Sequence, residues 1–189
     1  MKILLMSFAF AITSPAAWAQ ADTRITFADL DGTVIQATIV REQTLLRGNR
    51  QISNSRQSDW RIIIGPGDRI EYKLDAISHT KAGPRKAKPI HTVLRLEQPR
   101  EAAQLGGGHM VWVFEDQTLT NLRVYKGGAF KRTFAFARSG NGLSCSATET
   151  LARETGVKGV ELESSVDDAP IVILSAKQTS STCKVSKRN

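Results

Sequence analysis

Hydrophobic and polar residues alternate along much of this chain with a period of two. The clearest case is 69–76, RIEYKLDA, in which charged and apolar residues alternate without a break. Side chains on a β-strand point alternately to its two faces, so this pattern predicts a half-buried strand. Residues 90–96 follow the same rule less strictly, and 33–46 and 60–64 are rich in β-branched residues, which favour strands. The first half of the chain is therefore predicted to form a sheet.

A second group of strands is predicted after residues 98–108, QPREAAQLGGG, whose proline and three glycines indicate a flexible connection. Three apolar segments follow at short intervals, 109–114, 118–125 and 130–137. Short polar or glycine-rich turns separate them, which is typical of an antiparallel meander.

The turn between the last two of these strands determines which side chains share a face. A two-residue turn at the glycine pair 127–128 would place Arg123 opposite Arg132, and like charges in that position repel. A three-residue turn avoids this pair and brings Leu122 and Phe134 to one face. The sequence therefore predicts a three-residue turn with a glycine at positive φ.

One helix is predicted near 147–155. Residues 146–149, Ser-Ala-Thr-Glu, match a capping box, and Gly156 stands where a C-terminal cap glycine belongs. Two further strands are expected near 160–163 and 171–177. The whole pattern predicts a mainly β protein, an antiparallel, meander-rich barrel or sandwich with one short helix.

The first nineteen residues have the pattern of a signal peptide. Lys2 precedes an uncharged apolar stretch, 3–13, and Ala17-Trp18-Ala19 is a small-x-small cleavage pattern. The apolar stretch has eleven residues, which as a helix cover only about half of a bilayer core, so an anchor is disfavoured. We expect cleavage after Ala19 and a periplasmic or secreted product.

Residues 20–189 are predicted to form a single β-rich domain. The connection at 98–108 divides this domain into two possible sub-lobes, 20–97 and 109–189. Each half alone would have a marginal core. We therefore expect one monomeric domain whose sheet continues across the connection.

Cys145 and Cys183 are the only cysteines in the chain. Two thiols in one small exported domain usually pair, so a disulfide between them is predicted. The alternative is a nucleophilic cysteine with a histidine base, but His79, His91 and His109 follow no recognisable pattern around either cysteine. No Cys-x-x-Cys or His-x-x-x-His spacing occurs, so neither a metal nor another cofactor is expected.

Positive charge is concentrated in the segments 79–89 and 123–138, neither of which contains an acidic residue. The net charge is +8, or +7 once Lys2 is removed. A layout of this kind attracts anionic polymers and membrane surfaces, although a charged loop can also serve solubility alone. Aromatic residues do not alternate with the cations of 79–89, so there is no specific nucleic-acid signature. The candidate binding cations are Lys81, Arg85, Lys86, Lys88, Arg123, Lys126, Lys131 and Arg132.

Trp112 and Tyr125 mark a second candidate site. With a two-residue turn at 116–117 they share one face of the meander, and the other face is also substantially apolar. One face must line the core, and the other needs a cover, which is either the carboxyl-terminal part of the chain or a ligand or partner. In the ligand alternative, Trp112 and Tyr125 form the walls of a pocket.

Familiar catalytic patterns are missing, including Gly-x-Ser-x-Gly, the P-loop and His-Glu-x-x-His. The sequence therefore leads to an exported, non-catalytic binding or envelope-associated domain. Its expected partner is an anionic polymer or membrane surface, bound through 79–89 and 123–138. The alternatives are a carrier of a small apolar ligand near Trp112 and Tyr125 and, less favoured, an enzyme that uses a cysteine and a histidine.

Overall fold

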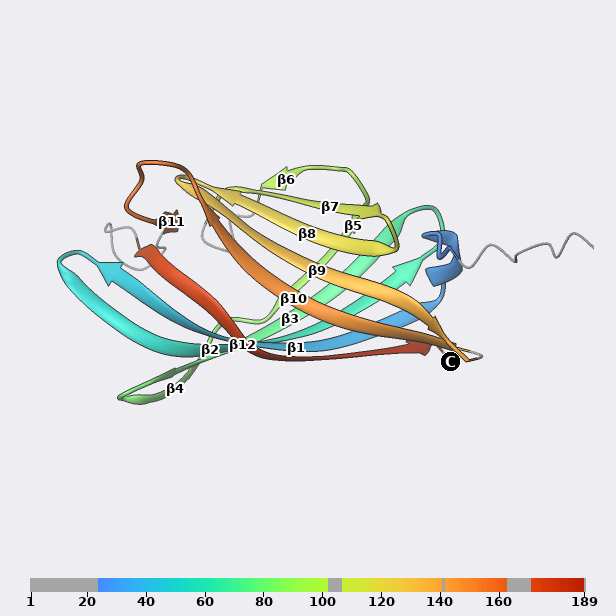
Figure 1. The fold of residues 1–189 in the computed structure, drawn as a ribbon, viewed down its shortest axis with the longest axis horizontal. Coiled ribbons are helices and arrows are strands. Elements are labelled where there is room, and N and C mark those ends of the chain that lie inside the picture. Colours follow the sequence, from blue (N-terminus) through green and yellow to red (C-terminus); the bar gives the residue numbers. More distant parts are fainter. Residues whose placement is uncertain (1–23, 102–106, 141, 163–170, 189) are drawn as a thin grey trace, which may run out of the picture.

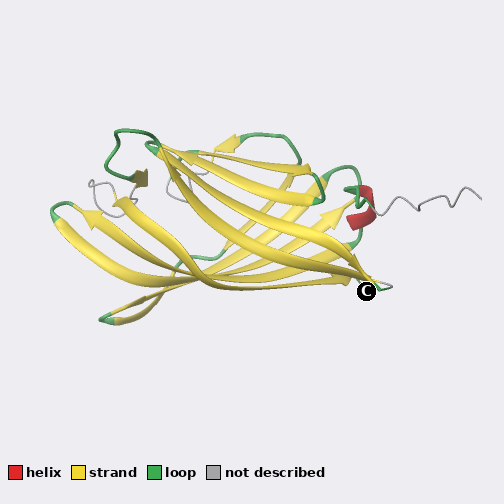
Figure 2. Ribbon diagram, in the orientation of Figure 1, coloured by secondary structure: helices red, strands yellow, loops and turns green. Residues whose placement is uncertain are grey.

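The computed structural model describes residues 24–101, 107–140, 142–162 and 171–188. Most of them belong to β-strands, and the helical structure in this part of the chain is a three-residue 3₁₀ turn, η1 (Ala28–Leu30) (Figure 2). The strands form two antiparallel sheets, which confirms the predicted mainly β class (Figure 1). The predicted signal peptide and its cleavage site lie outside the described residues, as do residues 102–106 of the predicted connection.

Seven strands form the first sheet, and they come from both ends of the chain. They are β1 (Thr33–Arg47), β2 (Arg50–Gly65), β3 (Arg69–Thr80), β4 (Gly83–Lys86), β5 (Ile90–Arg95), β11 (Val160–Leu162) and β12 (Ile171–Lys187). Their order is β11-β12-β1-β2-β3-β4, and β5 also pairs with β3. The carboxyl-terminal strand β12 pairs with the whole of β1, from Thr33 opposite Lys187 to Arg47 opposite Ile171.

Five strands form the second sheet, in the order β10-β9-β8-β7-β6. They are β6 (Arg100–Glu101), β7 (His109–Glu115), β8 (Thr118–Tyr125), β9 (Gly128–Ser139) and β10 (Gly142–Arg153). The meander predicted from 109 to 137 is confirmed as β7, β8 and β9. The predicted two-residue turn at Asp116 and Gln117 is also confirmed, because Glu115 lies opposite Thr118.

The helix predicted near 147–155 is wrong, because most of these residues belong to strand β10. Ser146 lies opposite Ala135 of β9, and Glu149 lies opposite Arg132. Burial alternates along β10, with Ala147 and Glu149 buried and Thr148 exposed. The capping-box spacing is a local signal of modest energy, and pairing with the long strand β9 outweighs it.

The turn between β8 and β9 also differs from the prediction. Tyr125 lies opposite Gly128, so the turn has two residues, Lys126 and Gly127, rather than three. The predicted glycine at positive φ is confirmed, since the φ of Gly127 is 84°. A Cβ atom on Gly127 would lie 2.5 Å from the carbonyl oxygen of Gly159, so this position requires glycine.

This register decides where two arginines of the meander point. A three-residue turn would have placed Arg123 and Arg132 on opposite faces, because side chains alternate along a strand. In the structure Arg123 lies opposite Phe130 and Arg132 lies opposite Asn121. All four side chains are buried and face the interior.

The two sheets pack face to face in a curled, half-barrel arrangement. They lie one above the other and diverge toward the end that carries the turn between β1 and β2 (Figure 1). Aromatic residues from both sheets fill the centre of the main core, with ring centroids 5.5–6.2 Å apart. These residues are Trp60, Tyr72, Trp112 and Phe134.

The predicted disulfide is confirmed. Cys145 of β10 is bonded to Cys183 of β12, with 5.5 Å between the two Cα atoms. The bond joins the outer strand of the second sheet to a strand of the first sheet. Because both cysteines are bonded, neither is a free thiol in this state.

Replacing both cysteines with alanine should lower the free energy of unfolding by about 3–4 kcal/mol, because the disulfide constrains a long loop in the unfolded chain. Cys145 and Cys183 are separated by 38 positions. Urea unfolding followed by circular dichroism measures the effect. Ser144→Ala, at an exposed neighbour on β10, is the matched control. An unchanged unfolding midpoint in the cysteine variant would contradict this role of the disulfide.

Candidate functional site

Four of the predicted binding cations lie on or beside a hairpin that projects from the first sheet (Figure 1). The hairpin is formed by β3 and β4, which meet where Thr80 lies opposite Gly83. All four side chains are exposed, and none forms an ion pair with an acid of the described residues. These cations are Lys81, Arg85, Lys86 and Lys88. We call them the basic hairpin.

The cations predicted from 123–138 do not form one surface. Lys126 is exposed and lies 3.1 Å from the carboxylate of Glu161, and Lys131 is also exposed. Arg123 and Arg132, in contrast, are only 3% and 5% exposed. These two arginines are therefore part of the interior rather than of a basic outer face.

Trp112 and Tyr125 belong to different parts of the core. Trp112 is completely buried, and its ring packs against those of Trp60, Tyr72 and Phe134. Tyr125 lies in a second, smaller apolar cluster, where its ring contacts Phe130 edge-on. Their side chains are therefore not opposite walls of one pocket.

A polar layer separates the main core from the smaller apolar cluster. On β8 the inward-facing residues are Leu119 in the main core, then Asn121 and Arg123, then Tyr125 in the smaller cluster. Strands β1, β9 and β10 have the same sequence of apolar, polar and apolar inward positions. The inward-facing polar residues of this layer are Arg41, Gln43, Arg56, Asn121, Arg123, Arg132 and Glu149.

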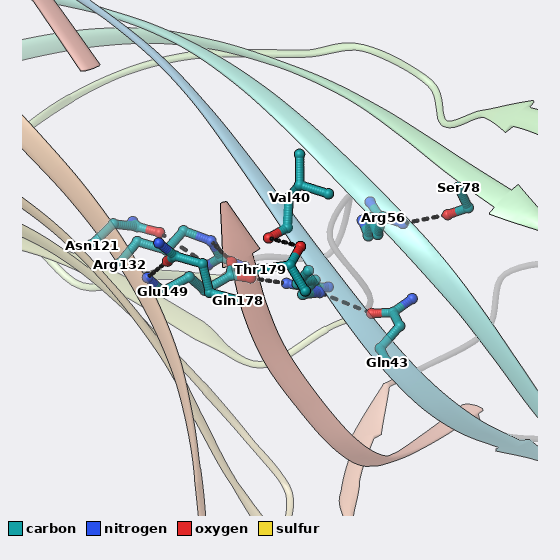
Figure 3. Close-up of polar contacts among 10 residues, drawn as sticks. Val40, Gln43, Arg56, Ser78, Asn121, Arg132, Glu149, Gln178 and Thr179 are labelled. Atoms are coloured by element: carbon teal, nitrogen blue, oxygen red, sulfur yellow. Dashed lines mark hydrogen bonds and ion pairs between the residues drawn. The ribbon is translucent and has the colours of Figure 1, made fainter. Parts of the chain in front are cut away.

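Glu149 connects the two sheets through ion pairs with two of these arginines. One carboxylate oxygen pairs with Arg41 of the first sheet, and the other lies 2.5 Å from Nε of Arg132 in the second sheet. All three side chains are less than a tenth exposed. The backbone N–H of Glu149 donates to the side-chain oxygen of Gln178 at 2.6 Å, which fixes β10 beside β12 (Figure 3).

The other two arginines form no ion pair with a described acid. Arg56 lies directly opposite Arg41 in the pairing of β1 and β2, and it donates to the hydroxyl of Ser78 at 3.4 Å (Figure 3). The guanidinium of Arg123 lies 5.3 Å from the ring centre of Trp60. Its Nε and Nη2 atoms are buried and have no hydrogen-bond acceptor among the described residues. We call Arg41, Arg56, Arg123 and Arg132, together with Glu149, the arginine cluster.

Burial and mutual repulsion weaken the proton affinity of the unpaired arginines. Burial lowers the pKa of Arg56 to about 10, with further lowering by the charges of Arg41, Arg132 and Arg123. Burial and the charge of Arg132 likewise lower the pKa of Arg123 to about 10. Both remain protonated at pH 7.

The positive charges of the cluster also shift the pKa of Glu149, and here they favour the ionised form. Burial alone would raise the pKa of this carboxyl group, but the charges of Arg132 and Arg41 outweigh burial and lower the pKa to about 2. Arginine side chains keep their charge in proteins, so the arginine cluster carries four positive charges against the one negative charge of Glu149 at neutral pH.

Unpaired buried donors outnumber unpaired buried acceptors in the described interior. Several buried N–H groups have no acceptor among the described residues. The nitrogen atoms concerned are Nε1 of Trp60, Nε1 of Trp112, Nδ2 of Asn121, and Nε and Nη2 of Arg123. Oδ1 of Asn54 is a buried acceptor that has no donor among the described residues. The arrangement is suited to a group that carries several hydrogen-bond acceptors.

Sequence reasoning missed three members of the cluster. Arg41 follows Ile35, Ala37 and Ile39 on the inward face of β1, so strict alternation would have placed it inside. The inward position of Arg56 follows from the pairing of β2 with β1, in which Arg56 lies opposite Arg41. The helix predicted near 147–155 includes Glu149, so the sequence does not predict the inward position of Glu149 on strand β10.

No known protein family, no characterised protein and no solved structure matches this chain. Within the described ranges, no three His, Cys, Asp or Glu side chains form a group that could hold a metal ion. In those ranges there is also no helix of the length and apolar character needed to cross a membrane.

Glu149→Gln should lower the free energy of unfolding at pH 7 by about 3–5 kcal/mol, because it leaves Arg41 and Arg132 buried without a counter-charge. The folded-state pKa lies below the ordinary 4.5, so the stabilisation is complete above about pH 4.5 and is lost as the pH falls toward 2.

Urea unfolding at several pH values measures both effects, and the variant should lack the part of the acid dependence that Glu149 contributes. Glu42→Gln, at an exposed position on β1, is the matched control and should behave like the unchanged protein. Equal losses in the two variants would contradict the assigned role of Glu149.

Proposed function

We propose that this chain is an exported, non-catalytic binding domain that holds an anionic ligand between its two sheets. The observation that carries the proposal is the composition of the arginine cluster, four inward-facing arginines against one glutamate. Export is supported by the signal-peptide pattern of residues 1–19.

Uncompensated charge in a protein interior is costly, because burial removes the water that stabilises an ion. A core that needed only stability would place apolar residues at these positions, and such replacements are often neutral or stabilising. A bound anion would supply the missing negative charge. Residues that destabilise the free protein and are stabilised by a ligand are typical of binding sites.

The arginines are also held in place before any ligand binds. Guanidinium groups of Arg41 and Arg132 lie 4.5 Å and 5.2 Å from the ring centre of Phe130, and Arg123 lies over Trp60. Cation–π contacts of this kind restrict the side chains without using their N–H groups. The donors remain directed at a ligand at little cost in conformational entropy.

Arg123→Met separates the binding role from a structural role. The free variant should be as stable as the unchanged protein or up to about 4 kcal/mol more stable, because an unpaired buried charge is removed. The unchanged protein should gain thermal stability from sulfate beyond the gain from chloride at equal ionic strength, since an anion that binds only the folded state stabilises it.

Thermal unfolding in the two salts measures this difference, which the Arg123→Met variant should lack. Arg61→Met is the matched control, because Arg61 lies on the exposed outer face of β2. A destabilised Arg123→Met variant with an intact sulfate response would overturn the proposal.

A second candidate function is the binding of anionic polymers or membrane surfaces through the basic hairpin. Four exposed cations without acidic partners in the described residues support it. This contact would use long-range attraction rather than a buried site, so it should weaken with added salt.

Replacing all four cations of the basic hairpin with alanine should remove most of the retention on heparin and on anionic vesicles. The matched control removes the same charge from exposed cations elsewhere, namely Arg50, Arg61, Lys73 and Lys184. Co-sedimentation and heparin elution measure the result. Equal loss in both variants would indicate that only net charge matters.

A further inference from the structure

The four arginines of the cluster fall into two pairs. Arg41 and Arg132 share the carboxylate of Glu149, whereas Arg56 and Arg123 form no ion pair with a described acid. Arg56 belongs to the first sheet and Arg123 to the second. The guanidinium of Arg123 lies 5.3 Å from the ring centre of Trp60, and Arg56 precedes Trp60 on the same inward face of β2. Both unpaired arginines therefore belong to one layer of the interior.

The unpaired atoms of Arg123 point to a particular geometry of contact. Its free donors are Nε and Nη2, which lie on the same edge of the guanidinium plane. That edge presents two parallel N–H groups and matches two oxygen atoms of one oxyanion. A carboxylate would have both of its oxygens engaged by this contact, whereas a phosphate group retains further oxygens for a second arginine.

The charge of the cluster favours a doubly charged ligand group. Four arginines and one glutamate leave an excess of three positive charges among the described residues. A monoanion would leave two of these charges uncompensated, and a dianion would leave one. At close range inside a protein each uncompensated charge is expensive, so the dianion is preferred.

We infer that the ligand carries a phosphate dianion, either free phosphate or a phosphate monoester, which bridges Arg123 of the second sheet and Arg56 of the first sheet. The inference rests on the proposed function and names the ligand class of the same site.

The ionisation of the phosphate provides a test, because Glu149, Arg56 and Arg123 do not titrate near neutral pH. Glu149 of β10 stays ionised above about pH 2, and Arg56 of β2 and Arg123 of β8 stay protonated below about pH 10. Arg41 of β1 and Arg132 of β9 are the remaining charged groups, and Gln178 of β12 and Ser78 of β3 are neutral.

Isothermal titration of the purified protein at constant ionic strength should use inorganic phosphate, phenyl phosphate, dimethyl phosphate, acetate and sulfate. At pH 8 phosphate or phenyl phosphate should bind at least about tenfold more tightly than dimethyl phosphate and acetate, which are monoanions. Affinity for phenyl phosphate should rise about tenfold between pH 5 and pH 8, because the second pKa of a phosphate monoester is about 6. Sulfate, a dianion throughout, controls for titration of the protein itself.

Arg56→Met and Arg123→Met should each weaken phosphate binding by about tenfold or more. Arg123→Lys retains the charge but lacks the two-pronged donor edge, so it should also bind weakly. Arg61→Met should bind normally. Circular dichroism and unfolding midpoints establish that each variant is folded. The relative affinities of phosphate and phenyl phosphate identify free phosphate or a monoester as the preferred form.

Two contrary outcomes are distinguishable. If acetate and dimethyl phosphate bind as tightly as phenyl phosphate, and Arg123→Met abolishes all of this binding, the phosphate inference is overturned while the proposed function stands. If no anion binds in a manner that depends on Arg56 or Arg123, both are overturned.

Discussion

The ion pairs of Glu149 connect the two sheets through their interior. They join a strand of the first sheet to two strands of the second, at a depth where water does not screen the charges. Because one carboxylate serves both Arg41 and Arg132, it fixes how the sheets face each other. Arg56 and Arg123 have no acidic partner among the described residues. This surplus of positive charge is the basis of the proposed anion site.

Strand β10, which carries Glu149, lies beside β12 where the two sheets meet. We call this contact between β10 and β12 the seam. Strand β12 contacts β10 through side chains and the disulfide rather than through a regular ladder. The hydroxyl of Ser181 donates to the carbonyl oxygen of Ala147 at 2.7 Å, and Gln178 accepts from the backbone of Glu149. Backbone groups at a sheet edge need partners, and here side chains satisfy some of them. The covalent bond between Cys145 and Cys183 keeps this seam in register near the main core.

The main core and the arginine cluster contribute differently to stability. The main aromatic core and the disulfide provide stability at one end of the half-barrel, where the sheets are close. The arginine cluster lies further along the strands, next to the smaller apolar cluster, where a charged layer costs stability. A protein can retain such a layer when ligand binding compensates for its cost in stability.

Local signals in the chain, namely alternation, turn residues and the cysteine count, suffice to predict the mainly β class, most strand positions, the meander of 109–137 and the pairing of Cys145 with Cys183. They do not reveal the strand at 142–153, because the capping-box pattern there predicts a helix and only pairing with β9 establishes the strand. Tertiary structure alone decided the site. A one-residue difference in the β8–β9 turn reverses the facing of every side chain that follows, so the inward positions of Arg123 and Arg132 depended on a register that only the packed sheets specify. The meeting of Arg41, Arg56 and Glu149 required contacts between residues as much as 108 positions apart, which no local pattern encodes.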